Sequence, residues 1–161
     1  MIALENLPEH SRLWFFQCDR FLTESEHLRV EEGIQTFITD WESHGAKMAA
    51  GFALYHKSLL IVALDEAQAP ASGCGIDKCF RVVDQLSKTL SINFLSRTTV
   101  LFQSKSGMEL APLNQFWAMK KAGLIDLSTL VVDTTIGKLG DLPPSGLKRF
   151  DQTWHMEMWS H

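Results

Sequence analysis

A cysteine flanked by glycines stands out in the stretch 72-SGCGIDKC-79 of this 161-residue chain. Apolar residues recur at helical spacing from Ile76 to Leu90, so Cys74 is expected at the N-terminus of a helix. The free backbone N–H groups and the partial positive charge of such a terminus stabilise anions, including a cysteine thiolate. These residue types therefore suit nucleophilic or redox chemistry at Cys74.

An activated cysteine needs a base, and the base needs a group that orients it. His44 precedes a glycine at the end of a predicted helix, and Asp65 follows the apolar run 59-LLIVAL-64. In this hypothesis Cys74 is the nucleophile, His44 is the general base, and Asp65 orients the imidazole, a role that Asp77 could also fill. Backbone N–H groups of the helix would stabilise the developing anion.

Two non-catalytic interpretations use the same loop. In the first, the loop binds a phosphate or carboxylate through Ser72, free backbone N–H groups and Lys78, although neighbouring acids would repel an anion. In the second, Ser72 caps the helix, Asp77 complements the helix dipole, and Cys74 only fills space. The sequence leaves these alternatives open. The residues expected to bind a ligand are Gly45, Glu66, Ser72, Gly73, Gly75, Asp77 and Lys78.

Patterns along the chain predict the elements that must position these residues. Thr23 and Glu26 form a capping box ahead of apolar residues at helical spacing, which predicts a helix that ends at His44-Gly45. Two apolar runs separated by Lys57 and its neighbours predict a β-hairpin. In chain order the expected elements are a strand at 12–18, a helix at 24–43, strands at 49–56 and 58–64, a helix at 75–90 and a strand at 97–103.

This order predicts an α+β fold with a ferredoxin-like β-α-β-β-α-β core, in which both helices cover one face of an antiparallel sheet. The core is expected to span 1–109, and a C-terminal α/β annex at 110–161 is expected to pack on the same domain. The topology brings the His44-Gly45 turn and the loop from Asp65 to Asp77 to one end of the core. A functional cleft is therefore expected at that end. The annex is predicted to contain a short helix at 112–122 closed by Gly123, a strand at 128–134 and an edge strand in 153-TWHMEMW-159.

Two familiar kinds of site are excluded by what the chain lacks. The run 59-LLIVALDE-66 is similar to the Walker B strand of nucleotide hydrolases, but the G-x-x-x-x-G-K-[ST] phosphate loop that must accompany it does not occur. The chain is therefore not a P-loop ATPase. Zinc is not expected either, because Cys74 and Cys79 are five positions apart and face different sides of the predicted helix. No metal and no other cofactor is expected.

One combination of residues carries a resemblance to a protein family. It consists of Trp41-x-x-His44-Gly45, Asp65-Glu66-x-Gln68, Ala71-Ser72-Gly73-Cys74-x-Ile76-Asp77-Lys78 and Thr153-Trp154-His155. The combination resembles a family of short, uncharacterised bacterial proteins that are often labelled ABC transporter ATPase. The chain lacks both the phosphate loop and the LSGGQ-type signature that such an ATPase requires. The resemblance implies a standalone cytosolic protein, and it assigns no catalytic residue.

Composition limits the partners. The 15 basic residues are scattered among 19 acids, and a net charge of -4 provides no cationic surface for nucleic acid. No leader pattern and no apolar run of membrane-spanning length occurs, and three cysteines fit reduced thiols, so a cytoplasmic protein without a membrane partner is expected. The partners that are left are a small-molecule or anionic ligand and a second copy in a homodimer. The second copy would join through an open sheet face, or through the Trp- and Met-rich tail if that tail is exposed and not packed as an edge strand. Whether the chain is an enzyme or a binding or assembly module stays open.

Overall fold

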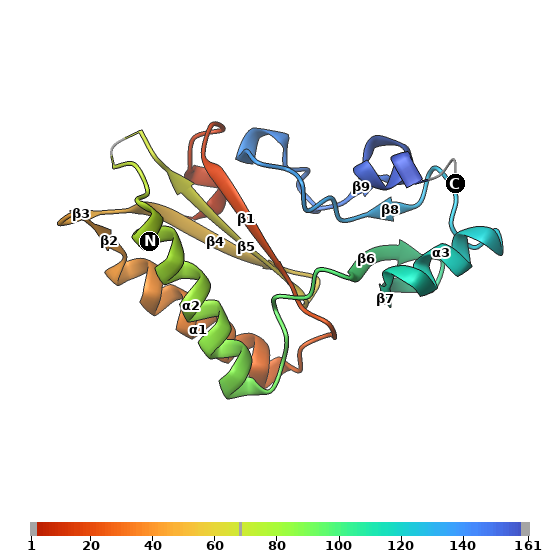
Figure 1. Ribbon diagram of the computed structural model, residues 1–161, viewed down its shortest axis with the longest axis horizontal. Helices are drawn as coiled ribbons and strands as arrows, with labels where there is room; N and C mark the ends of the chain where they lie inside the picture. The colour runs from red at the N-terminus through yellow and green to blue at the C-terminus, as the bar shows by residue number, and fades with distance from the viewer. Residues whose placement is uncertain (1–2, 68, 159–161) are drawn as a thin grey trace. The chain divides into compact units, whose positions relative to one another are not determined.

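The computed structural model describes residues 3–67 and 69–158 (Figure 1). Within them the chain forms two compact units. The first unit is Met1–Ser96 together with Ile136–Asp141, and the second is Arg97–Thr135 together with Leu142–His161. Each unit contains its own antiparallel sheet.

In the first unit, β5 (Leu59–Asp65) lies between β1 (Arg12–Gln17) and β4 (Ala49–Tyr55). Both neighbours pair with β5 in antiparallel register, β4 along its whole length and β1 from Leu59 to Leu64. Every residue of β5 is buried, which agrees with its uninterrupted apolar run, because a central strand covered on both faces needs no polar side. The predicted hairpin of β4 and β5 is confirmed, and its turn places His56 and Lys57 at positive φ.

Helices α1 (Glu24–Asp40) and α2 (Gly73–Leu90) cover one face of this sheet (Figure 1). Their inward residues pack on the alternate β5 residues Leu60, Val62 and Leu64 in one hydrophobic core. These inward residues are Val30, Ile34 and Ile38 of α1 and Cys79, Val83 and Leu90 of α2. The α1 residues, and Val83 and Leu90 of α2, belong to the apolar spacing from which the sequence predicts the two helices, whereas Cys79 does not. No helix in the described part of the chain is long and apolar enough to cross a membrane.

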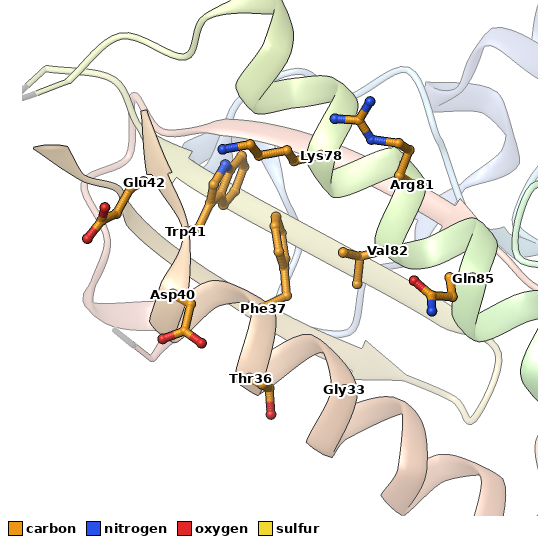
Figure 2. Close-up of a pocket in the computed structure, with 10 residues that line it drawn as sticks. All are labelled: Gly33, Thr36, Phe37, Asp40, Trp41, Glu42, Lys78, Arg81, Val82 and Gln85. Atoms are coloured by element: carbon orange, nitrogen blue, oxygen red, sulfur yellow. The ribbon is translucent and has the colours of Figure 1, made fainter. Parts of the chain in front are cut away.

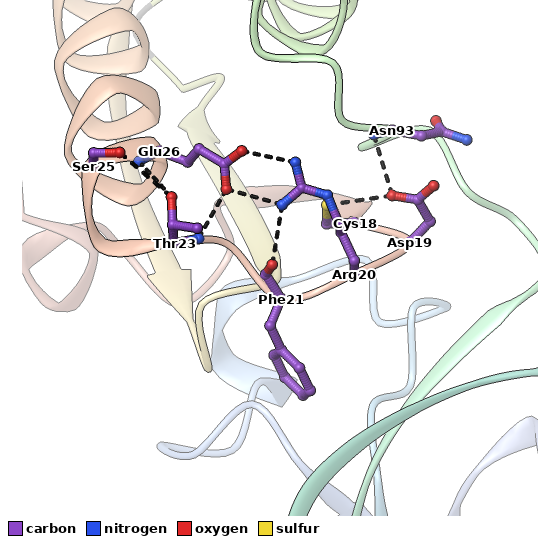
Figure 3. Close-up of polar contacts among 8 residues, drawn as sticks. All are labelled: Cys18, Asp19, Arg20, Phe21, Thr23, Ser25, Glu26 and Asn93. Carbon is purple, nitrogen blue, oxygen red and sulfur yellow. Dashed lines mark hydrogen bonds and ion pairs between the residues drawn. The ribbon is translucent and has the colours of Figure 1, made fainter.

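The predicted capping box begins α1 (Figure 3). The Glu26 N–H donates to Thr23 Oγ1 at 3.3 Å, and the Thr23 N–H donates to the Glu26 carboxylate at 2.8 Å. Arg20 adds two hydrogen bonds of 2.7 and 2.9 Å to the same carboxylate. These donors, the Arg20 guanidinium first and the Thr23 N–H second, lower the pKa of Glu26 to about 2.

The end of α1 differs from the prediction. The helix ends at Asp40, and the following residues form a hairpin of β2 (Glu42–Ser43) and β3 (Ala46–Lys47). His44 and Gly45 are the two residues of its turn, with φ values of 51° and 80°. A two-residue type I′ turn requires positive φ at both positions. The prediction that His44-Gly45 closes the helix is therefore wrong, because the glycine serves a hairpin turn and not a helix cap.

The second unit consists of β6 (Thr99–Ser104), β7 (Gly107–Pro112), α3 (Leu113–Lys121), β8 (Leu130–Val131) and β9 (Lys148–Arg149). Its sheet has the strand order β7-β6-β8-β9, and aromatic side chains form the centre of its hydrophobic core. Phe116 of α3 lies at the centre, with its ring centroid 5.2 Å from that of Phe102 and 6.0 Å from that of Phe150. Gly123, at φ 74°, follows α3 as predicted.

The α+β class is correct, but the described residues do not form the predicted ferredoxin-like sheet. Its expected fourth strand, β6, pairs with β7 and β8 in the second unit. The edge of β1 that faces away from β5 contacts the later segment Ile136–Asp141. The contacts are a β-bridge between Arg12 and Lys138 and a 3.0 Å hydrogen bond from the Leu13 N–H to the Gly137 carbonyl. The observed units consequently divide between residues 96 and 97, inside the segment 1–109 that was expected to form one core.

The tail differs from the prediction as well. Residues Trp154–Met158 form a short 3₁₀ helix, η4, where an edge strand was expected, and Trp159 lies outside the described residues. The rings of Trp154 and His155 stack with centroids 4.0 Å apart. Consecutive side chains in a strand point to opposite faces, so this stacking is incompatible with a strand. The other 3₁₀ helices are η1 (Leu4–Asn6), η2 (Leu139–Asp141) and η3 (Phe150–Gln152).

Candidate functional site

The β2–β3 hairpin and the loop after β5 meet beside the first turn of α2. Ser72 is the N-cap of α2, and its hydroxyl oxygen accepts a 3.1 Å hydrogen bond from the Gly75 N–H. The Ser43 hydroxyl oxygen lies 3.1 Å from the same Ser72 oxygen, so β2 is tied directly to the start of the helix. The expectation that these two connections share one end of the molecule is confirmed, and so is the capping role of Ser72.

Cys74 and His44, the hypothetical nucleophile and base, are both exposed. Within the described residues neither side chain makes a hydrogen bond or an ion pair. Cys74 is the second residue of α2, so its N–H is one of those that a helix leaves free. Cys18 and Cys79 are buried, and burial raises the pKa of both thiols, that of Cys79 to about 12. Cys74 is thus the accessible thiol of the three.

Asp65 is buried at the end of β5, where it already has partners. Its Oδ1 accepts a 2.9 Å hydrogen bond from the Ala67 N–H and lies 2.9 Å from Nε2 of the exposed His10. The Ala67 N–H, and after it His10, lower the pKa of Asp65. The histidine in contact with Asp65 is therefore His10, where the hypothesis had placed His44. Antiparallel pairing of β1 with β5 places Arg12 opposite Leu64 and so brings His10 to this end of β5.

The other predicted ligand-binding residues lie around the same loop. Glu66 Oε1 accepts a 3.2 Å hydrogen bond from the Ala71 N–H and lies 3.9 Å from Arg12 Nη1, so Glu66 closes the loop on itself. Among the described residues, no group of three or more His, Cys, Asp or Glu side chains could hold a metal ion. Gly45, Gly73, Asp77 and Lys78 are exposed, and Gly75 is buried.

Gly75 is covered by polar atoms from three elements. A β-carbon at Gly75 would lie 3.5 Å from Ser72 Oγ and 3.7 Å from both Ser43 Oγ and Trp41 Nε1. Trp41 is 1% exposed, and its Nε1 has no hydrogen-bond partner among the described residues. The end of α1 and the hairpin strand β2 therefore lie against the start of α2, at ordinary van der Waals distance from the position of a Gly75 β-carbon.

A groove of about 520 Å³ runs between α1 and α2 near this junction (Figure 2). Phe37 of α1, Trp41 directly after α1 and Val82 of α2 lie between the two helices and form its apolar floor. The Phe37 and Trp41 rings contact each other, with centroids 4.9 Å apart. Of the predicted site residues, Lys78 lines this groove. Its volume falls within the range of about 300–1,000 Å³ that is typical of small-molecule sites.

The groove has walls of opposite charge. Lys78 and Arg81 stand on the α2 side, and Asp40 and Glu42 stand at the end of α1 and in β2 (Figure 2). All four side chains are exposed, and within the described residues none of them makes an ion pair or hydrogen bond. This groove was not predicted from the sequence. The available signal was the stripe Lys78, Arg81, Val82 and Gln85, whose spacing places a mixed charged and apolar face on one side of α2.

Comparisons of the chain with protein-family models, with curated proteins and with solved structures find no match. The resemblance to short bacterial proteins therefore stays a prediction. A function for this chain has to be argued from the geometry of its own side chains.

Proposed function

We propose that the chain is a non-catalytic binding module for a small molecule, and that the groove between α1 and α2 is its binding site. The observation that carries this proposal is the groove itself, in which an aromatic floor lies between unpaired charges. Small-molecule sites combine an apolar lining with a few polar groups that orient the ligand. The groove has both parts.

The packing of the two helices supports a preformed site. A β-carbon at Gly33 of α1 would lie only 2.7 Å from Leu86 Cδ2 of α2, so the helices approach closely at this point. Gly33 also lines the groove, so this close contact between the helices borders the proposed site. Both helices are anchored in the same hydrophobic core. A site on such rigid elements needs little ordering when a ligand binds, which favours affinity.

The matched residues Thr36 and Thr39 provide a test. Both are exposed on α1 and both donate a side-chain hydrogen bond to the carbonyl four residues earlier, but Thr36 lines the groove and Thr39 is not among its lining residues. A fragment library is screened by protein-observed NMR for compounds that shift the amide signals of Phe37 and Val82. Thr36→Trp should abolish binding of these compounds, and Thr39→Trp should retain it. If no compound shifts the groove signals, or if both variants bind equally, the proposal fails.

The exposure of Cys74 at the start of α2 favours a second candidate function, a cysteine-dependent activity. In this candidate Cys74 is the nucleophile and His44 is the base, while Asp65 is held by His10. The loop residues Ser72, Gly73 and Gly75 would surround the reacting group.

The rate of Cys74 alkylation against pH tests this candidate. An apparent pKa well below the roughly 8.5 of a free cysteine, which rises in His44→Ala, would support a coupled Cys and His site. An unshifted pKa that does not respond to His44→Ala would remove the catalytic candidate and leave the binding module.

A further inference from the structure

The positive and negative side chains of the groove lie on opposite sides of it. The α2 side is positive through Lys78 and Arg81, which are three residues apart and share a helix face. The opposite side is negative through Asp40 and Glu42. Because these four groups make no ion pairs within the described residues, their charges are available to an occupant of the groove.

The helix ends reinforce this separation of charge. Asp40 is the last residue of α1, and the last turn of α1 contains no basic residue. A carboxylate at this place lies beside the negative end of the helix dipole, where it disfavours the helix. The position of Asp40 is thus not explained by helix stability. At the end of α1, the free backbone carbonyl groups and the Asp40 carboxylate both contribute negative charge. This part of the groove is therefore suited to bind a cation.

The floor between the charged sides is apolar. Phe37 and Val82 are partly buried against the core, and the Phe37 ring rests on Trp41. A ligand whose apolar middle part contacts this floor would place one polar end toward α2 and the other toward the end of α1. The chemical class of the ligand follows from the positive side, the negative side and the apolar floor of the groove.

We propose that the groove binds a zwitterionic small molecule with an apolar body, such as a short apolar peptide. Its carboxylate is held by Lys78 and Arg81, and its ammonium group is held by Asp40 and Glu42. Phe37, Trp41 and Val82 contact the apolar side chains. This inference depends on the proposed binding function and adds to it the chemical class of the ligand.

Four forms of one dipeptide test the ligand class. The probes are Leu-Phe, its C-terminal amide, its N-acetyl form, and the N-acetyl amide, which together remove each charge singly and both at once. Binding is followed by calorimetry and by the amide signals of Phe37 and Val82. Leu-Phe should bind most tightly, and each single block should weaken binding about tenfold, the effect of one charge-assisted contact.

Paired variants assign each charge to its side of the groove. Lys78→Gln with Arg81→Gln should weaken Leu-Phe and N-acetyl-Leu-Phe but leave the amide unchanged. Asp40→Asn with Glu42→Gln should weaken Leu-Phe and the amide but leave N-acetyl-Leu-Phe unchanged. Lys88→Gln is the matched control, because Lys88 is an exposed lysine of the same helix that pairs with Asp84 and does not line this groove.

The outcomes separate the two proposals. Equal binding of all four probes at the groove signals would overturn the zwitterionic class and leave the binding module intact. The zwitterionic class is also overturned if no probe binds while fragments still shift the Phe37 and Val82 signals. If neither probes nor fragments bind in the groove, both proposals fail.

Discussion

The hydroxyl oxygens of Ser43 and Ser72 lie 3.1 Å apart, and this contact joins the β2–β3 hairpin to the N-cap of α2. Ser72 Oγ also accepts a hydrogen bond from the Gly75 N–H. One hydroxyl group therefore caps the start of α2 and contacts a hairpin that is distant in the sequence. The contact holds Glu42 of β2 and Lys78 of α2 near the same junction, where both line the groove. The local cap thus contributes to the geometry of the candidate binding site.

The first prediction concerns this pair of serines. Ser72→Ala removes the cap and should lower the free energy of unfolding by about 1 kcal/mol. Ser43→Ala should cost less, and the double variant should cost less than the sum, with a coupling of about 0.5 kcal/mol or more because the residues are in contact. Urea unfolding of the four proteins measures this cycle. Strictly additive losses would show that the two hydroxyl groups do not interact.

The second prediction concerns the thiols. Iodoacetamide at pH 8 should modify Cys74 in the folded protein, because it is exposed, and should spare Cys18 and Cys79, because burial raises the pKa of both. In urea all three should react. Intact-mass spectrometry before and after unfolding counts the modified groups. Rapid modification of Cys79 in the folded state would contradict its placement in the core.

The third prediction concerns the start of α1. Arg20→Gln removes the largest cause of the low Glu26 pKa, so this pKa should rise from about 2 toward its ordinary value of 4.5. Because the pKa of Glu26 is depressed in the folded state, its stabilising effect is present above about pH 4.5 and is lost as the pH falls toward 2. NMR titration of the Glu26 side chain measures the shift. Arg29→Gln, an exposed change on the same helix, is the control and should leave the titration of Glu26 unchanged.

The fourth prediction concerns His155 in the second unit. Thr153 Oγ1 donates its hydrogen to the Phe150 carbonyl at 2.9 Å, so in its 3.1 Å contact with His155 Nδ1 the imidazole must be the donor. Burial lowers the pKa of His155 to about 4, although Asp133 acts in the opposite direction. Between pH 6.5 and about 4, His155 is therefore protonated in the unfolded chain but neutral in the folded protein. The free energy of unfolding should consequently fall as the pH falls through this window.

The slope in that window should be at most about 1.4 kcal/mol per pH unit from this group. His155→Phe should abolish this contribution, since the site is already formed by Phe116, Phe150 and the stacked Trp154. Urea unfolding at a series of pH values compares the two proteins. An identical pH dependence in His155→Phe would show that another group causes it.

Local patterns predicted the elements of the first unit well. Thr23 and Glu26 marked the start of α1, and the spacing of Val30, Ile34 and Ile38 marked its buried face. The partner of β6 could not be predicted in this way, since the apolar run at Val100–Phe102 suits either sheet. The strand that follows, β7, and the later residues Leu130 and Val131, which pair with Gln103 and Phe102, place β6 in the second sheet.

The candidate site was predicted in part. The residue types in the loop predicted the capping role of Ser72, because a helix cap depends on residues that are close in sequence. The contacts of Asp65 with His10 and of Ser72 with Ser43 join residues 55 and 29 positions apart, and no short motif encodes them. The groove was missed for a related reason, because Phe37 and Val82 have the spacing of core residues and only the packed helix pair leaves them partly open.

Because Ile136–Asp141 packs on the edge of β1, the first unit cannot complete its fold until a late part of the chain has been synthesised. While the chain emerges from the ribosome, β1, β4, β5 and both long helices are available once residue 96 has left the tunnel, but the edge of β1 still lacks its hydrogen-bond partner. That edge is completed only after residues 97–135 have been made. During this interval the nascent first unit presents an open strand to its surroundings, which is the interval in which a chaperone would have most effect on its yield.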